Sequence, residues 1–286
     1  MKRVMTKAKK VTLIVFLAIA AAAIIAVCAY FVTVHCMSKR YNLIKVDTSS
    51  VCEPSSETMI ETDVELSFGK MHYAKIGSGE QAVILVHGNG SNHTKLASLG
   101  RYLANSYTVY LPDSRNHGQS DSASEISYKL ISADLVEFAE KLNIEKPIVI
   151  GHSDGGIVAI NTAIEYPDFM KAFVSFGANS HPSKFKAYFT IGVKIKNAFK
   201  HSILNDMMLN EPNFTPTDLA KIRTPAFIVA GEFDIMYLSD TAYIANNIKD
   251  SEIAIIQGAN HSNYVHDGKK SYAIVKPFLD RIKGAE

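Results

Sequence analysis

The chain has few cysteines and little net charge, and each shortage excludes a class of protein. Only three cysteines occur among 286 residues, at Cys28, Cys36 and Cys52. Residues 61–286 therefore contain no cysteine and can hold no disulfide. The net charge is only +2, which argues against a nucleic-acid partner. Repeats and low-complexity runs are also absent from the sequence.

Sequence motifs for bound metals and cofactors are absent as well. No group of residues has the spacing of zinc ligands, and no G-x-x-x-x-G-K-[ST] phosphate loop occurs. We therefore expect chemistry that uses no cofactor and no metal. Hydrophobic residues make up 47% of the chain. After its N-terminal segment the chain is long enough for one sizeable α/β domain.

Residues 11–34 form a run of 24 positions without an ionisable side chain. A helix of that length spans about 36 Å, enough to cross a hydrocarbon core of about 30 Å with some tilt. We therefore expect a transmembrane anchor. A cleaved signal peptide is the alternative, because Val27-Cys28-Ala29 offers a small-residue cleavage site, but the apolar part of such a peptide is usually shorter.

The charges that flank this run predict its orientation. Residues 1–10 carry five basic side chains and fewer follow the run, so the positive-inside bias favours a basic cytoplasmic tail. The protein is then a single-pass protein of the cell membrane with residues 61–286 outside, or a secreted protein if the segment is cleaved. Residues 35–60, which are rich in serine and threonine around positions 47–57, are expected to form a flexible tether.

An apolar, strand-like run ends in Gly151-His152-Ser153-Asp154-Gly155. The pattern G-x-S-x-G between a strand and a helix is typical of a nucleophile elbow. Serine is a poor nucleophile at neutral pH, so it must be exposed by a sharp turn and must meet a base. Small residues at Gly151 and Gly155 would prevent clashes in that turn. Ser153 is the candidate nucleophile.

Two later segments supply a candidate acid and a candidate base. Asp234 follows one short apolar run, and His261 follows the next. The order serine, aspartate, histidine is that of the α/β-hydrolases, in which each residue follows a strand of one parallel sheet. Glu232 is an alternative to Asp234, and His266 is an alternative to His261.

From about Val64 to the C-terminus the chain resembles the α/β-hydrolases, and two further segments agree. Residues 87–90, His-Gly-Asn-Gly, match the oxyanion loop of that family, and residues 113–120 are similar to its D-x-R-G-x-G-x-S loop. Asn116 stands where the second loop has glycine, and asparagine tolerates left-handed backbone. The resemblance implies a mostly parallel central sheet flanked by helices, with a short cap over about residues 179–223.

The resemblance also implies a role for each site residue. Ser153 would attack an acyl carbonyl, His261 would take its proton, and Asp234 would hold the imidazole in the correct tautomer. The backbone N–H groups of Asn89 and Asp154 would bind the oxyanion that develops.

His87 and Asp154 are candidate substrate-binding residues. The elbow is similar to that of biphenyl-hydrolase-like and valacyclovir-hydrolase-like members, and a carboxylate at Asp154 would attract a substrate that carries an amine. Alternatively, Asp154 only begins a helix, where the macrodipole favours an acid. His87, like His117, also fits a residue that structures its loop through hydrogen bonds.

Residues 183–200 contain five lysines and no acid, interleaved with apolar side chains at helical spacing. This segment predicts either a cap helix with solvated lysines or a surface that contacts anionic lipid headgroups or an amphiphilic substrate. We therefore expect a membrane-anchored serine hydrolase that cleaves a small-molecule or lipid-like carboxylic ester. A hydrolase of C–C bonds, thioesters or amides, or a non-catalytic binding protein with the same fold, is the alternative.

Overall fold

The computed structural model describes residues 13–25, 27–28, 41 and 43–284. The chain divides into two compact units, residues 1–43 and residues 44–286. In the first unit, residues 13–25 are helical and most of their side chains are exposed.

The predicted anchor over residues 11–34 is thus described only in part. Residues 11–12, 26 and 29–34 and the basic tail over residues 1–10 lie outside the described residues. Among the residues that are described, no helix combines the length and the apolar character needed to cross a membrane.

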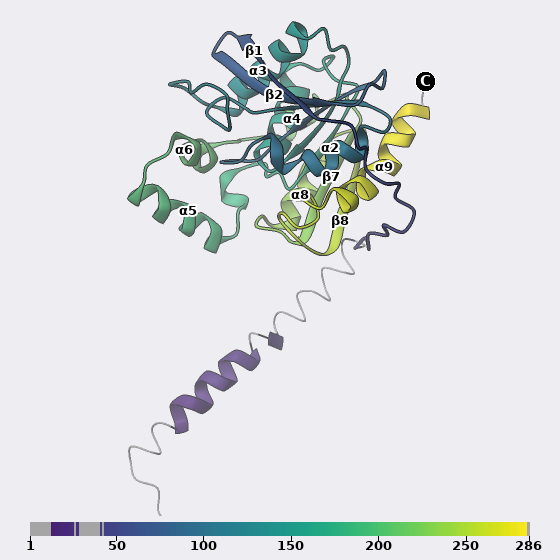
Figure 1. The fold of residues 1–286 in the computed structure, drawn as a ribbon. Helices are drawn as coiled ribbons and strands as arrows, with labels where there is room; N and C mark the ends of the chain where they lie inside the picture. Colours follow the sequence, from purple (N-terminus) through teal and green to yellow (C-terminus); the bar gives the residue numbers. More distant parts are fainter. Residues whose placement is uncertain (1–12, 26, 29–40, 42, 285–286) are drawn as a thin grey trace, which may run out of the picture. The chain divides into compact units, whose positions relative to one another are not determined.

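The second unit is built on a sheet that has eight strands in the described part of the chain (Figure 1). These strands are β1 (Ile60–Leu66), β2 (Gly69–Ile76), β3 (Ala82–Val86), β4 (Thr108–Pro112), β5 (Ile148–His152), β6 (Ala172–Phe176), β7 (Ala226–Phe233) and β8 (Ser251–Asn260). They lie in the order β1-β2-β4-β3-β5-β6-β7-β8. Pairing is antiparallel between β1 and β2 and between β2 and β4, and parallel elsewhere. The predicted α/β fold with a mostly parallel sheet is confirmed.

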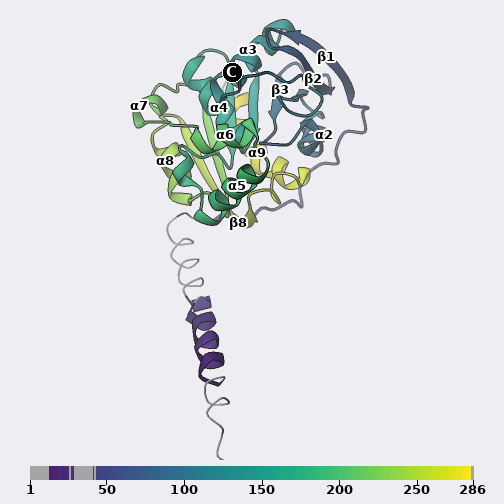
Figure 2. The same ribbon diagram turned by 90° about the vertical axis from the view of Figure 1, so that its left-hand side faces the viewer.

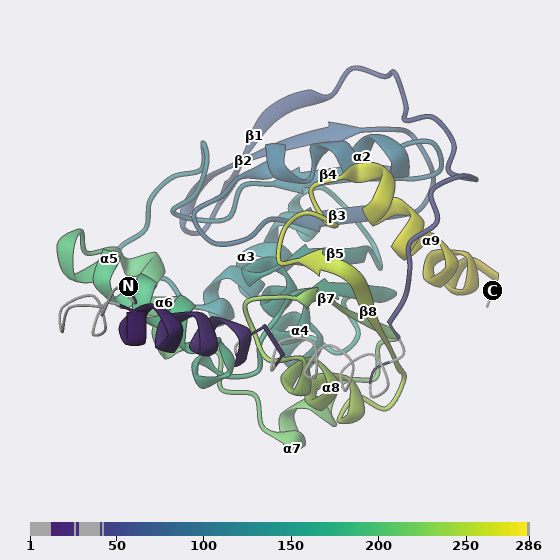
Figure 3. The ribbon, with the colours of Figure 1, turned by 90° about the horizontal axis from the view of Figure 1, so that it is seen from below.

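Helices cover both faces of the sheet, so its central strands are apolar throughout. One face carries α3 (Tyr128–Lys141), α4 (Asp154–Glu165) and α8 (Leu238–Asn246), and the other carries α2 (Ala97–Leu103) and α9 (Gly268–Gly284) (Figure 3). Side chains of a strand alternate between these faces. In β3, for example, Ile84 packs in the core under α3 and α4, while Val83 and Leu85 pack in the core under α2 and α9.

The segment predicted as a cap lies between β6 and β7. It contains η2 (Pro182–Lys184), α5 (Ala187–Phe199), α6 (Ile203–Asn210) and α7 (Pro216–Leu219). Figures 1 and 2 show α5 and α6 next to each other, to one side of the sheet. Phe189 and Val193 on α5 pack against a small cluster of three buried residues, Phe185, Met208 and Met236. This cluster attaches α5 to the domain.

The part of the predicted tether that is described runs along the domain. The Ile44 amide donates to the Ile255 carbonyl of β8 at 2.8 Å, and the Ser55 amide donates to the Arg101 carbonyl of α2 at 2.9 Å. The compact second unit therefore begins at Ile44 rather than near residue 61. Long-range backbone hydrogen bonds hold this segment in place, although its composition is typical of a linker.

Candidate active site

Ser153 lies in the sharp turn between β5 and α4, with φ 56° and ψ −118°. A positive φ is strained for a residue with a side chain, and such strain is typical of functional turns. A Cβ atom on Gly151 would lie 2.0 Å from the Gly155 carbonyl oxygen, and one on Gly155 would lie 2.0 Å from the Val86 carbonyl oxygen. The expectation that small residues prevent clashes in this turn is confirmed.

The fold brings Ser153, His261 and Asp234 together from three loops that follow parallel strands. The Ser153 Oγ lies 3.0 Å from the His261 Nε2, and the His261 Nδ1 lies 2.6 Å from the Asp234 Oδ1. An ionised carboxylate can only accept, so the His261 Nδ1 carries the hydrogen and its Nε2 accepts from the serine hydroxyl. This arrangement can remove a proton from Ser153.

Asp234 is fully buried, with a relative exposure of 0%. Burial opposes its ionisation, but hydrogen bonds from His261 and from the amides of Gly231 and Ile235 outweigh that effect. They hold the pKa of Asp234 below its usual value. The carboxylate therefore stays charged next to His261 and can stabilise an imidazolium.

The two alternatives from the sequence lie elsewhere. Glu232 is buried, but its Oε2 accepts from the Gly258 amide at 2.9 Å on β8. His266 is exposed, and its ring stands 5.2 Å from that of His152, measured between centroids. Asp234 and His261 are thus the acid and the base that the structure brings to Ser153.

His152 has a structural function that the sequence does not predict. Its Nε2 lies 2.8 Å from the His261 carbonyl oxygen, and it must donate because a carbonyl can only accept. Burial, together with the nearby His261, lowers the pKa of His152 to about 3. His152 is therefore neutral at working pH and holds the loop that carries His261. Its position directly before Ser153 is the one signal for this role in the sequence.

The predicted oxyanion loop passes directly over the elbow. A Cβ atom on Gly88 would lie 3.0 Å from the Ser153 Cβ, so glycine permits this close approach. The Asn89 Nδ2 donates to the Asp154 Oδ2 at 2.9 Å and to the Leu204 carbonyl of α6 at 3.1 Å. Asn89 therefore connects the residue after the nucleophile to the cap segment.

Asp154 is buried in the first turn of α4. Burial raises its pKa, and the contacts with Asn89 and with the Tyr128 hydroxyl offset only part of that effect. The Asp154 carboxylate thus has a structural partner in Asn89, and it lies beside Ser153 in the chain.

His87 begins the predicted oxyanion loop, and its buried side chain connects this loop to the one over residues 113–120. Its Nδ1 donates to the Gly88 carbonyl at 2.8 Å, and its Nε2 accepts from the Ser114 amide at 3.1 Å. Burial and the neighbouring His117 lower the pKa of His87 to about 4, so the ring is neutral. These contacts fit the loop-structuring alternative for His87.

Side-chain hydrogen bonds hold the loop over residues 113–120. Asn116 has φ 64°, and its Nδ2 donates to the Ala123 carbonyl at 2.9 Å, so the departure from glycine is tolerated as predicted. Arg115 forms two hydrogen bonds with the Asp134 carboxylate, at 2.6 and 2.5 Å. A buried bidentate pair of this kind fixes the loop in one geometry.

Comparisons with known proteins agree with this geometry. The family model for the alpha/beta hydrolase fold matches residues 81–210. The serine hydrolase BPHL of Mus musculus is 22% identical over 270 residues, which cover 81% of this chain and 92% of that protein.

Two solved structures are also similar to this chain. A thermophilic esterase from Thermogutta terrifontis has a TM-score of 0.64 at 18% identity, covering 79% of this chain and 99% of that one. A membrane phospholipase A described as a bacterial virulence factor has a TM-score of 0.67 at 16% identity, covering 97% of this chain and 99% of that one. Residues 81–210 therefore match the α/β-hydrolase family, and the chain has the fold and the Ser-His-Asp geometry of a serine hydrolase.

Proposed function

We propose that the protein is a carboxylesterase that works through an acyl-enzyme on Ser153. The Ser153 Oγ attacks the ester carbonyl carbon while the His261 Nε2 takes the hydroxyl proton. The backbone amides of Asn89 and Asp154 bind the oxyanion, and each such donor contributes about 3 kcal/mol in analogous sites.

The acyl-enzyme then forms and breaks down through proton transfers that all pass through His261. His261 gives its proton to the leaving alkoxide, and Asp234 stabilises the imidazolium between the two transfers. A water molecule next attacks the acyl carbon, passes a proton to His261, and releases the acid as Ser153 recovers its hydrogen. The observation that carries this proposal is the chain of hydrogen bonds from Ser153 through His261 to Asp234.

We further propose that the ester is lipid-like, because α5 has an exposed apolar face. Four side chains on this face are exposed at helical spacing, namely Tyr188 (64%), Ile191 (56%), Ile195 (53%) and Phe199 (90%). Lysines flank this face along the segment. A helix with apolar and basic side chains exposed is suited to an anionic lipid surface or an amphiphilic substrate. The solved neighbour described as a phospholipase supports the same substrate class.

We also propose that residues 11–34 anchor the protein in the cell membrane, with the N-terminus cytoplasmic and the hydrolase domain outside. The absence of ionisable side chains from this run and the basic cluster before it support the proposal. Protease added to intact cells should remove the domain. Digestion only after lysis would reverse the orientation, and a soluble shortened product would favour signal cleavage.

A substrate screen with the full chain in detergent tests the esterase proposal. We expect turnover of p-nitrophenyl esters, with kcat/KM rising as the acyl chain lengthens, and labelling of the protein by a fluorophosphonate probe. Ser153→Ala should abolish both while the protein stays folded. Labelling of this variant at the wild-type rate would overturn the assignment of Ser153. Labelled wild-type protein that cleaves no ester would instead point to thioester, amide or C–C bond hydrolysis.

A pair of variants on α5 tests the lipid-like substrate. Phe199→Ser removes the most exposed apolar side chain of the helix. We expect it to raise KM for long-chain esters presented in micelles by several-fold and to leave KM for a short, soluble ester unchanged. Ala198→Ser, an exposed position next to Phe199 on the same helix, is the control. Equal effects on the two classes of ester would exclude this surface from substrate binding.

A further inference from the structure

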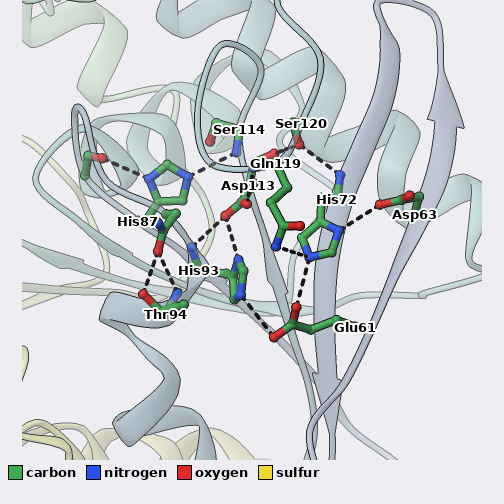
Figure 4. A network of polar contacts seen from close by, with 12 residues as sticks. Glu61, Asp63, His72, His87, His93, Thr94, Asp113, Ser114, Gln119 and Ser120 are labelled. Atoms are coloured by element: carbon green, nitrogen blue, oxygen red, sulfur yellow. Dashed lines mark hydrogen bonds and ion pairs between the residues drawn. The ribbon is translucent and has the colours of Figure 1, made fainter.

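Three side chains far from one another in the sequence converge at the β1–β2 edge of the sheet (Figure 4). The His72 Nε2 lies 3.5 Å from the Glu61 Oε2, and the His93 Nε2 lies 3.6 Å from the Glu61 Oε1. One candidate ligand atom from each of these residues lies within 4.8 Å of the other two. We call these three residues the Glu61 cluster.

The strand register explains why this cluster forms. Asp63 on β1 lies opposite His72 on β2 in the antiparallel pair, and Glu61 shares the face of Asp63 because side chains alternate along a strand. His93 begins η1 (His93–Lys95), which follows the predicted oxyanion loop. Two strands and a 3₁₀ helix therefore each supply one member of the cluster.

Two carboxylates orient the histidines of the cluster. The His72 Nδ1 lies 2.7 Å from the Asp63 Oδ1, and the His93 Nδ1 lies 2.9 Å from the Asp113 Oδ1. An ionised carboxylate can only accept, so each Nδ1 carries the hydrogen. When such a ring is neutral, its lone pair is on Nε2, the atom that faces Glu61. In that state the Glu61 carboxylate and the two Nε2 atoms are three acceptors that face one another, an arrangement suited to a cation.

His93 is buried, at 3% exposure, and its Nε2 has no hydrogen-bond partner within the part of the chain that the structure describes. An unsatisfied buried acceptor costs about 1–3 kcal/mol. The His72 Nε2 lies 3.1 Å from the Gln119 Nε2, and this neutral amide is its donor. A single cation between Glu61 and the two rings would satisfy the His93 Nε2, the acceptor that has no partner.

We propose that Glu61, His72 and His93 form a Zn²⁺ site. Tetrahedral zinc holds nitrogen and oxygen ligands at about 2.0–2.1 Å, which places ligand atoms about 3.3 Å apart. The two Nε2 atoms lie 3.5 Å from Oε2 and 3.6 Å from Oε1 of Glu61. One ligand atom from each residue lies within 4.8 Å of the other two, so small side-chain movements bring the three to an ion. Imidazoles whose Nδ1–H is held by a carboxylate are the usual zinc ligands. Gln119 swings away from His72 when the ion binds.

Three protein ligands leave the fourth position of the ion for water. Glu61 and His93 line a surface cavity together with Met59, Thr94 and Arg101, so an ion and its water can enter from solvent. The bound ion would join the β1–β2 hairpin to η1, four residues after Asn89. The site thus stabilises the domain without touching substrate.

Metal titration of the full chain tests this proposal. The protein is first treated with a chelator, and Zn²⁺ binding is then followed by calorimetry and Co²⁺ binding by its visible ligand-field absorption. We expect one ion per chain and a Tm that rises with Zn²⁺. Glu61→Gln should weaken binding at least about 10-fold, since loss of even an outer partner of a metal ligand has an effect of that size.

Two further variants separate ligand loss from misfolding. Glu65→Gln removes the same charge from an exposed position on the same strand and should bind Zn²⁺ like the wild type. His72→Gln should weaken binding as Glu61→Gln does, with an unchanged circular dichroism spectrum. Absence of Zn²⁺ and Co²⁺ binding in the wild-type protein, or equal affinity in wild type and Glu61→Gln, would overturn the site.

Discussion

The Ser153 site and the Glu61 cluster orient histidine in the same way but present it to different partners. Asp234 accepts from the His261 Nδ1 at 2.6 Å, and Asp113 accepts from the His93 Nδ1 at 2.9 Å. In both places a buried carboxylate therefore fixes the lone pair on Nε2. At the elbow that lone pair meets a serine hydroxyl, whereas at the β1–β2 edge it meets a second carboxylate.

The partner of Nε2 determines what each histidine can do. A hydroxyl can give up its proton, so His261 is placed as a base toward Ser153. The Glu61 carboxylate has no proton to give, so His93 and Glu61 together are placed as ligands toward a cation. The same imidazole–carboxylate pair thus supports a catalytic function in one region and a metal-binding function in the other.

The largest expected effect separates the two histidine sites by activity. His261→Ala should lower kcat by about 10⁴–10⁶-fold, since removal of a triad histidine costs about this much in comparable enzymes. Glu61→Gln should leave kcat within about 2-fold, because it touches neither substrate nor Ser153. Steady-state kinetics on one ester measures both. If Glu61→Gln lowers kcat as much as His261→Ala does, the Glu61 cluster takes part in catalysis and the two sites are not separate.

The next largest effect distinguishes the two acids near the end of β7. Asp234→Asn should lower kcat about 10⁴-fold, because the amide can no longer hold the correct tautomer of His261. Glu232→Gln should cost less than about 10-fold, because its partner is the Gly258 amide on β8. If Glu232→Gln is the more damaging change, the acid has been assigned to the wrong residue.

A smaller effect is expected for His152, which acts on His261 through its backbone. His152→Ala removes the donor to the His261 carbonyl and should lower kcat about 10–100-fold, the range that a small misplacement of a catalytic group produces. KM should not change, and His152→Gln should recover part of the activity because its amide can donate. His266→Ala is the control, because the exposed His266 ring lies beside His152. A fall in kcat for His266→Ala as large as that for His152→Ala would remove the specific role of His152.

The smallest effect concerns the buried carboxylate of Asp154. Burial raises its folded pKa, so ionisation disfavours the folded state and stability falls as pH rises through the ordinary aspartate value. Asp154→Asn should therefore raise Tm at pH 7, by less than about 4 °C, the shift that 1 kcal/mol produces in a domain of this size. The gain should vanish at pH values below the ordinary aspartate pKa.

The same variant tests whether Asp154 meets substrate. If its carboxylate attracts an amine, Asp154→Asn should raise KM for amino-acid esters several-fold more than KM for neutral esters of similar size. Equal KM changes for the two substrate sets would leave Asp154 as a residue that holds Asn89 at the start of α4.

The sequence by itself determined the elements whose requirements are local. The elbow needs small residues on both sides of Ser153, and the buried parallel strands need continuous apolar runs. Both requirements leave a pattern within a few consecutive residues. The order of Ser153, Asp234 and His261 along the chain then matched one fold, because each residue follows a strand of the same sheet.

Only the tertiary structure decided which distant side chains meet. The Glu61 cluster depends on the β1–β2 register and on the position of η1, so no ligand spacing appears in the sequence. The contact from His152 to the His261 carbonyl joins the end of β5 to a loop 109 residues away in the sequence. The apolar face of α5 has the same period whether it is buried or exposed, and packing alone leaves Phe199 at 90% exposure. Contacts between distant segments depend on how the whole chain packs, and no short stretch of sequence specifies them.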